Sequence, residues 1–378
     1  MKLNLINNIS FYGKIIDSHC HAGHWKNNRN ELYDTTSDLD VFVKSKLDNG
    51  DSVEKIIVSN LDCMVNKSTD SKIEFFSDEI TGNRKMLEIC SKSQKFSALA
   101  TCQPTYGNVD NIKKIFNENP DKFIGLKFHP EQLNLAANNP AYKPYMEFAQ
   151  EKKLPCLFHS GNSYDVHYPD GGIAKASQVS RPEQIYELAK KYKDVPVILA
   201  HWGGDGEKNI NKTTDLIIES LKKKNSTLYG DISWVDCNNP QKPNLKKIIE
   251  RLKNEEGGLD RILFGTDAPL ERFGREGRDG LPAIKNYTNN INDIKNMIKK
   301  EFPSEADEII DKIFYKNANK LFFQKPNVPP PPQSRNKLGW IIAGAVIIGT
   351  VLGLYLHHKP QNAETSHNVE LQKLNVKA

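Results

Sequence analysis

The sequence lacks several features that would assign it to a common class. Its six cysteines include no C-x-x-C pair, and several lie inside apolar runs. Such spacing is typical of free thiols in a reducing compartment and disfavours a disulfide framework. No G-x-G-x-x-G motif follows any apolar run, which disfavours a dinucleotide-binding fold. Since the first 14 residues contain no continuous apolar segment, no signal peptide is expected.

The chain also lacks a strong charge bias. Its net charge is only +5 over 378 residues, and the lysines are spread along the chain beside Glu and Asp. A nucleic-acid-binding surface would need a denser basic cluster. The charges are therefore expected to form solvated helix faces, and no nucleic-acid partner is expected.

Short apolar runs recur along the chain and alternate with helical patterns. A regular strand–helix alternation predicts a parallel sheet with helices outside it. Eight such repeats favour a closed (β/α)8 barrel, which takes about 250 residues or more. An open doubly wound sheet is the alternative, although the glycine motif that often accompanies it is missing. The predicted strands cover residues 15–21, 55–59, 96–102, 123–129, 154–159, 195–200, 227–233 and 261–265.

The first strand carries the pattern Asp17-x-His19-x-His21. Because side chains alternate between the two faces of a strand, these three residues are expected to share one face, with Cys20 on the other. Two imidazoles one pleat repeat apart can bind one divalent ion from the same side. A polar strand end with two surface histidines is the alternative.

Further ligand-type side chains follow other predicted strands. In a barrel these strand ends meet at the rim where active sites are built. Each residue alone could cap a strand or a turn, but their joint placement predicts one polar site. They are Lys127 and His129 after the fourth strand, His159 after the fifth, His201 after the sixth and Asp267 after the eighth.

Taken in order, these motifs resemble the amidohydrolase superfamily. They read D-S-H-C-H, G-L-K-F-H-P, L-P-C-L-F-H-S-G, V-I-L-A-H-W-G-G and L-F-G-T-D-A-P. Within the superfamily the chain is most similar to the amidohydrolase-related branch, which includes metal-dependent hydrolases and non-oxidative decarboxylases. The resemblance covers residues from about 14 to about 323 and ends at K-N-A-N-K-L-F.

The resemblance implies a metal site and a reaction. The implied metal ligands are His19, His21, His159 and Asp267 around one divalent ion, usually zinc. His201 would lie over the metal-activated water or the substrate, and Asp267 or His201 would act as general base. The expected reaction is attack of that water on a carbonyl of a small-molecule amide, ester or lactone.

Lys127 leaves the number of ions open. In some branches of the superfamily a lysine on the fourth strand is carbamylated and bridges two metals. In this chain that arrangement would use His159 and His201 for the second ion, with His129 beside them. The alternative is an unmodified Lys127 that orients substrate.

Two further sets of residues have alternative roles. Arg272, Arg275 and Arg278 could bind a substrate carboxylate or be surface charge. Asp231 could orient a ligand histidine or simply end its strand.

Three other functions compete with the hydrolase. A decarboxylase of an aromatic carboxylate would use the same metal site. TatD-like nucleases share the D-S-H-C-H opening, but they carry a metal-binding glutamate where this chain has Lys127. A scaffold without turnover is the alternative outside enzymology, although the complete ligand set argues against it.

The C-terminal part differs in composition from the rest. The expected organisation is a barrel over residues 1–323, a proline-rich linker over 324–337, a transmembrane helix over 338–356 and a polar tail over 357–378. The span holds 19 uncharged residues, which suffice to cross a hydrocarbon core about 30 Å thick. A C-terminal membrane anchor with a cytoplasmic catalytic domain is therefore expected.

Small residues recur along the predicted membrane helix. Ala345, Gly349 and Gly353 are spaced four residues apart. Such a stripe could pair two helices into a homodimer, or it could reflect the ordinary glycine content of membrane helices.

Overall fold

The protein was analysed as a computed structural model. It describes residues 13–26, 32–44, 47–64, 74–161, 166–167, 173–174, 176–204, 207–237, 245–270 and 283–324. The chain divides into two units, Met1–Lys325 and Pro326–Ala378, and every described residue lies in the first. The predicted membrane helix and tail, and the linker from residue 325 onwards, lie outside the described residues.

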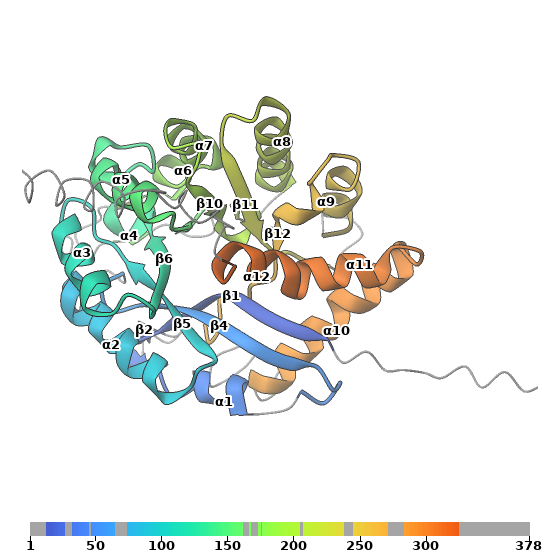
Figure 1. Ribbon diagram of the computed structural model, residues 1–378, viewed down its shortest axis with the longest axis horizontal. Helices are drawn as coiled ribbons and strands as arrows, with labels where there is room; N and C mark the ends of the chain where they lie inside the picture. The colour runs from blue at the N-terminus through green and yellow to red at the C-terminus, as the bar shows by residue number, and fades with distance from the viewer. Residues whose placement is uncertain are drawn as a thin grey trace, which may run out of the picture. The chain divides into compact units, whose positions relative to one another are not determined.

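Eight parallel strands form the central sheet, in an order that follows the sequence (Figure 1). The sheet closes where β1 meets the segment after β12: Ser18 N–H donates to the Phe264 carbonyl at 3.0 Å, and Asp267 N–H donates to the His19 carbonyl at 2.8 Å. The predicted (β/α)8 barrel is therefore confirmed, and the open sheet is excluded. The strands are β1 (Lys14–Ala22), β4 (Ser52–Asn60), β5 (Phe96–Thr101), β6 (Phe123–Phe128), β7 (Cys156–Phe158), β10 (Pro196–Leu199), β11 (Thr227–Asp231) and β12 (Ile262–Leu263).

Helices follow the strands and surround the barrel (Figure 1). They are α1 (Leu39–Lys44), α2 (Glu79–Lys92), α3 (Val109–Glu118), α4 (Pro130–Leu133), α5 (Lys143–Lys152), α6 (Ala176–Val179), α7 (Pro182–Lys191), α8 (Glu207–Lys223), α9 (Leu245–Leu252), α10 (Ala283–Glu301), α11 (Ala306–Asp311) and α12 (Asn317–Phe322). Shorter elements are the 3₁₀ turns η1 (Pro140–Tyr142), η2 (Ala200–Gly203) and η3 (Leu259–Arg261) and the π-helical turn Lys312–Lys316. Two small hairpins pair β2 (His24–Lys26) with β3 (Leu32–Asp34) and β8 (Val166–His167) with β9 (Ile173–Ala174).

The first strand contains an irregularity that changes which face Asp17 occupies. Asp17 pairs with Ile56 and Cys20 pairs with Val58, so β1 has one extra residue in this stretch. A bulge of this kind reverses the alternation of side chains. Asp17 therefore does not share a face with the two histidines, as the sequence pattern predicted. Its carboxylate instead accepts hydrogen bonds from the hydroxyls of Thr266 at 2.6 Å and Tyr287 at 3.1 Å.

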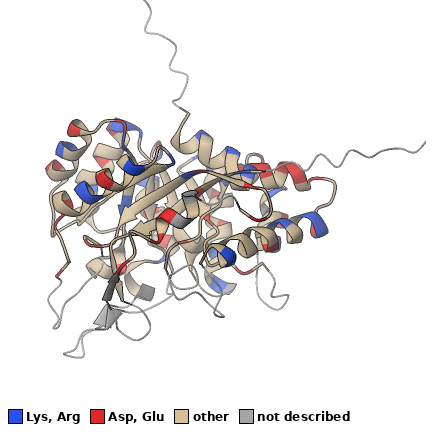
Figure 2. Cartoon of the chain, turned by 90° about the horizontal axis from the view of Figure 1, so that it is seen from below, with Lys and Arg blue, Asp and Glu red and all other residues tan. Residues whose placement is uncertain are grey.

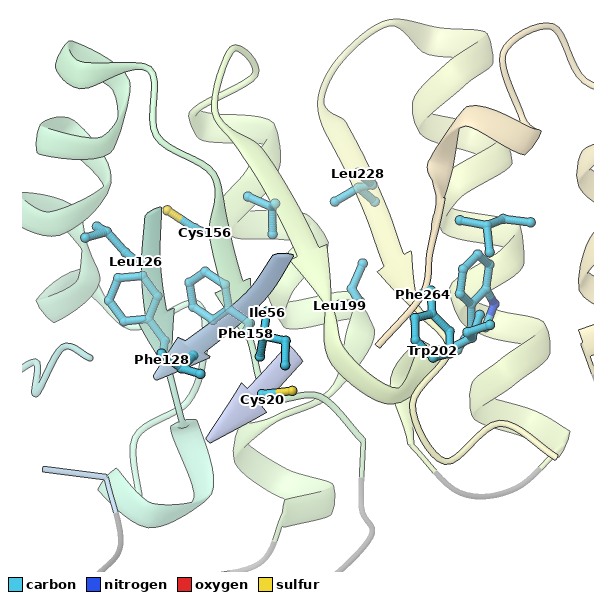
Figure 3. Close-up of a cluster of buried hydrophobic side chains, with 14 of the residues drawn as sticks. Cys20, Ile56, Leu126, Phe128, Cys156, Phe158, Leu199, Trp202, Leu228 and Phe264 are labelled. Atoms are coloured by element: carbon cyan, nitrogen blue, oxygen red, sulfur yellow. The ribbon is translucent and has the colours of Figure 1, made fainter. Parts of the chain in front are cut away.

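Apolar residues fill the barrel on two levels. Between the strands and the helices lies the main core, part of which is drawn in Figure 3 with Phe128, Phe158, Trp202 and Phe264. Inside the barrel, one apolar side chain from each of several strands forms a separate buried layer. These lumen residues are Ile16, Ile57, Leu99, Leu157, Ile198, Ala200 and Leu263. The polar residues of the strand ends lie later in these strands or directly after them.

Gly230 gives a direct test of the packing around β11. A Cβ on this residue would lie 2.4 Å from the ring of Trp202, which is fully buried. Gly230→Ala is therefore expected to destabilise the chain by about 1–3 kcal/mol, as overpacking does. Urea denaturation measures this loss. Trp202→Phe removes part of the clashing ring, so the losses of the two variants should not add. Strict additivity would show that the two positions are independent.

The outer helices carry charges of both signs (Figure 2). Several pair locally, as Lys246 does with Glu301 at 2.5 Å and Lys253 with Glu305 at 2.6 Å. Within the described part of the chain, no helix combines the length and the apolar character needed to cross a membrane.

Candidate metal centre

Three ligand-type side chains converge where β1 meets the end of β12. His19 and His21 extend from β1 beyond the bulge, and Asp267 follows β12. The Nε2 atoms of the two histidines are 3.1 Å apart, and Asp267 Oδ1 lies 3.3 Å from the first and 2.9 Å from the second. These separations resemble the edges of a tetrahedral zinc shell, which are about 3.3 Å for ligand bonds of 2.0–2.1 Å.

The other ring nitrogen of each β1 histidine has a protein partner. Asp231 Oδ2 lies 3.1 Å from His19 Nδ1, so the carboxylate holds the ring proton there. Ser59 Oγ lies 2.9 Å from His21 Nδ1 and donates its own proton to the Cys20 carbonyl, so it accepts from the ring. Both Nε2 atoms are therefore unprotonated and face each other with their lone pairs. A metal ligand needs this arrangement.

His201 joins the group from η2, directly after β10. Its φ is +55° and that of Trp202 is +51°, a left-handed conformation that non-glycine residues adopt only where surrounding contacts hold them. Ser233 donates its hydroxyl proton to Asp231, so its oxygen accepts the Nδ1–H of His201, 2.8 Å away. The Nε2 atom of His201 is consequently unprotonated. It lies 3.2 Å from His159 Nδ1.

Lys127 extends from β6 into the middle of this group and is completely buried. Its Nζ lies 2.9 Å from His19 Nε2. Burial, opposed by the charges of Asp267, Asp231 and Glu131, lowers the pKa of Lys127 to about 8. A metal ion on His19 Nε2 would take the lone pair that Lys127 contacts. The Lys127 amine could then be carbamylated, or it could contact an anionic group of a substrate.

A second group lies beside the first and contains His129, Glu131 and His159. Glu131 Oε1 is 3.2 Å from His159 Nε2, and Glu131 Oε2 is 3.2 Å from His129 Nδ1. The two rings stack with centroids 4.1 Å apart and planes 17° from parallel. The group is thus a second buried cluster of ligand-type side chains beside the first.

Asp267 is held in place from the side opposite the histidines. Trp234 Nε1–H donates to its Oδ2 at 2.8 Å, which leaves Oδ1 for the two β1 histidines. The backbone of Asp267 has φ +64° and that of Trp234 +63°. Four of the eight non-glycine residues with positive φ in the described chain thus lie at this centre. Such strain is common at functional sites.

The electrostatics of the centre suit a cation. Burial together with the charge of Lys127 lowers the pKa of His19 to about 4, and burial also lowers the pKa of His21. These rings are therefore neutral at pH 7, as metal ligands must be. Burial alone would raise the pKa of Asp267, but the surrounding imidazoles of His201, His21 and His19 hold that pKa well below its usual range. The carboxylate is therefore ionised.

The structure brings most of the predicted site residues together. His19, His21 and Asp267 come together, and Lys127 and His201 lie against His19. His159 contacts His201 but belongs to a second group with His129 and Glu131. Asp231 contacts His19 Nδ1. This contact fits the first of its two predicted roles, the orientation of a ligand histidine. Arg272, Arg275 and Arg278 lie outside the described residues.

Sequence reasoning missed four side chains of this centre. Ser59, Ser233 and Trp234 have no recognisable motif around them. Glu131 had a signal, because it follows His129-Pro130 directly and a carboxylate near a strand-end histidine is a usual orienting partner.

Trp234 allows a test of how Asp267 is held. Trp234→Phe keeps an aromatic ring and removes the hydrogen bond to Oδ2. A hydrogen bond to a charged group contributes about 1.5–3 kcal/mol, so divalent-metal affinity is expected to fall about tenfold or more. Competition with a chromophoric chelator measures the affinity. Unchanged binding would mean that the histidines alone hold Asp267 in place.

Comparison with known proteins gives a family. The sequence model of a family described as Amidohydrolase matches residues 113–324, more than half of the chain. A search of curated proteins finds no match.

Solved structures share the fold at low sequence identity. A protein from Staphylococcus aureus assigned as an amidohydrolase is 16% identical, with a TM-score of 0.51 over 82% of this chain and 99% of its own. A probable 2-pyrone-4,6-dicarboxylic acid hydrolase from Acinetobacter baumannii, solved with citric acid, is 15% identical, with a TM-score of 0.50 over 82% and 98%. The 2,6-dihydroxybenzoate decarboxylase from Rhizobium is 16% identical, with a TM-score of 0.49 over 82% and 98%.

Proposed function

Because the chain belongs to the Amidohydrolase family, whose members include hydrolases and decarboxylases, we propose that it is a metal-dependent hydrolase of small-molecule amides, esters or lactones. The observation that supports this most is the convergence of unprotonated imidazole nitrogens on one ionised carboxylate in a buried site. The family match does not support the alternatives of a TatD-like nuclease or a scaffold without turnover.

The proposed metal ligands are His19, His21, His159 and Asp267. A divalent ion such as Zn²⁺ supplies a Lewis acid for the substrate carbonyl and lowers the pKa of a bound water towards about 7. Neutral imidazoles and a carboxylate are the donors that zinc prefers. The donor set present in the chain therefore fits this ion.

Asp267 and His201 are the proposed proton acceptors. Asp267 Oδ1 is ionised and faces the β1 histidines, so it can take a proton from water in the centre. His201 Nε2 is unprotonated and can hold a proton while the leaving group departs. Lys127 lies close enough to His19 to orient an anionic substrate group.

A second pair of facing ring nitrogens bears on the number of metal ions. His159 Nδ1 and His201 Nε2 face each other at 3.2 Å, as the two β1 nitrogens do at 3.1 Å. This second pair favours a second ion if Lys127 is carbamylated. Intact mass spectrometry under gentle conditions, with and without added bicarbonate, would detect the carbamate, and the Lys127→Gln chain is the control.

A substrate panel tests the reaction. The metal-loaded chain would be incubated with esters, lactones and amides, and separately with aromatic carboxylic acids while CO₂ is measured. Turnover of the first group that chelation abolishes would support the hydrolase. CO₂ release without hydrolysis would assign the chain to the decarboxylases, and absence of both would contradict the proposal.

Membrane tethering through residues 338–356 is a separate proposal that rests on sequence alone. The uncharged 19-residue run and the four consecutive prolines before it support it. Fractionation of cells that express the full chain tests it, and a matched chain that ends at residue 325 is the control. Membrane association of the full chain alone is expected, with the barrel on the cytoplasmic side. Equal distribution of the two chains would contradict the tether.

A further inference from the structure

The turn directly after β10 has a backbone conformation that most residues avoid. Residues 201–204 are consecutive and all have positive φ, between +51° and +89°. Gly203 and Gly204 adopt such angles readily, whereas in His201 and Trp202 the Cβ atom makes them unfavourable. Contacts outside the turn must therefore hold it. Because His201 reaches the centre from this turn, those contacts also decide where its ring points.

Trp202 anchors the turn in the main core, where Figure 3 draws it. Its side chain is fully buried, and its ring occupies the space beside Gly230, where a Cβ would lie only 2.4 Å away. Its indole N–H donates to the hydroxyl of Thr214 on α8 at 3.0 Å. The two successive side chains thus reach different places: Trp202 lies in the core, and His201 lies beside His19 with ring centroids 5.0 Å apart.

The Thr214 hydroxyl is well suited to accept this hydrogen bond. It donates its own proton to the carbonyl of Ile210, four residues earlier in α8, at 2.8 Å. Its lone pairs therefore face the indole. Thr214 is only 1% exposed, so water cannot easily replace the bond, and an indole N–H left without an acceptor would be unfavourable.

We propose that Thr214 is a positioning residue: its hydroxyl holds the Trp202 indole and so keeps the left-handed turn that directs His201 into the metal centre. This inference rests on the proposed function for its consequence, the rate of the reaction. The turn itself exists in the metal-free chain.

Thr288 on α10 provides a matched control. It is 2% exposed, and its hydroxyl donates to the carbonyl of Ile284, four residues earlier, at 2.9 Å. It therefore has the same residue type, burial and bond within its helix as Thr214, but it does not accept the indole N–H of Trp202. Thr214→Val and Thr288→Val differ in the loss of that one contact.

Hydrogen exchange of the full-length, metal-free chain tests the first step. The amides of His201 and Gly204 donate to Asp231 Oδ1 and to the His201 carbonyl, so their exchange reports opening of the turn. Relative to β4 of the same chain, we expect about 3–10-fold faster exchange in Thr214→Val, as for one lost hydrogen bond. Thr214→Ser keeps the hydroxyl and should stay within twofold of wild type, as should Thr288→Val.

Two results of this experiment would overturn the proposal. One is wild-type exchange of the turn in Thr214→Val, and the other is an equal increase in Thr288→Val. If Thr214→Val does not fold, Trp202→Phe removes the donor from the other side of the same bond and should give the same faster exchange.

Steady-state kinetics of the metal-loaded chains test the second step. Since His201 is a proposed proton acceptor, kcat of Thr214→Val should fall about 3–10-fold while KM stays within twofold, and Thr214→Ser should restore kcat. Wild-type kcat in a Thr214→Val chain whose turn exchanges faster would overturn the positioning role. A wild-type chain without turnover would contradict the proposed function, and hydrogen exchange would still decide whether Thr214 holds the turn.

Discussion

Asp267→Asn is expected to reduce kcat/KM by about 10²–10⁴-fold, the range for loss of a positioned general base. The substitution keeps the shape of the side chain and its contact with Trp234. It removes the negative charge that faces His19 and His21 through Oδ1. An amide cannot accept a proton from water at neutral pH, and it is a weaker donor to zinc than a carboxylate.

The control for this variant is Asp215→Asn. Asp215 is half-exposed on α8 and pairs with Arg251, so its loss should leave kcat/KM within twofold of wild type. Steady-state kinetics on the best substrate of the panel, with metal in excess, measure both variants. An Asp267→Asn chain as active as Asp215→Asn would remove Asp267 from the mechanism.

The double variant His19→Ala/His21→Ala is expected to lose both metal binding and activity. Their two Nε2 atoms are 3.1 Å apart and share Asp267 Oδ1. The variant also removes His19 from Asp231 and both β1 histidines from Asp267, and a buried charge that loses a partner is costly. Zinc affinity should therefore fall by more than the 10–100-fold expected for loss of an orienting residue.

Stability must be measured beside metal binding in this variant. Circular dichroism and urea denaturation show whether the barrel still forms. A matched variant, His24→Ala, removes a partly exposed histidine that pairs with Asp62 at 2.8 Å, outside the group at the barrel centre. A folded double variant that binds zinc like His24→Ala would contradict the ligand assignment.

The barrel and the strands that carry the site could be predicted from sequence, because apolar runs and the residues that follow them are local patterns. The face occupied by Asp17 could not. The extra residue before Cys20 arises from how β1 pairs with β4 and with the segment after β12, and no local pattern encodes that pairing. A prediction from strict alternation of side chains along β1 therefore fails at the bulge.

The partners of the histidines depend on contacts between distant segments. Asp231 meets His19 across 212 positions, and Ser59 meets His21 across 38. Glu131 meets His159 because α4 turns back towards β7 directly after β6. No motif in the sequence singles out Ser59, Ser233 or Trp234. Most of the residues that gather at the site could thus be predicted, while their hydrogen-bond partners required the three-dimensional structure.

The measurement that tests the central claim most directly is the metal content of the full-length chain. The chain would be purified without chelators, loaded with Zn²⁺, desalted and analysed by inductively coupled plasma mass spectrometry beside His19→Ala/His21→Ala. The account predicts about one retained ion per wild-type chain, or two with a carbamylated Lys127, and almost none in the variant. Wild-type metal content far below one ion per chain, and no higher than that of the variant, would contradict the account.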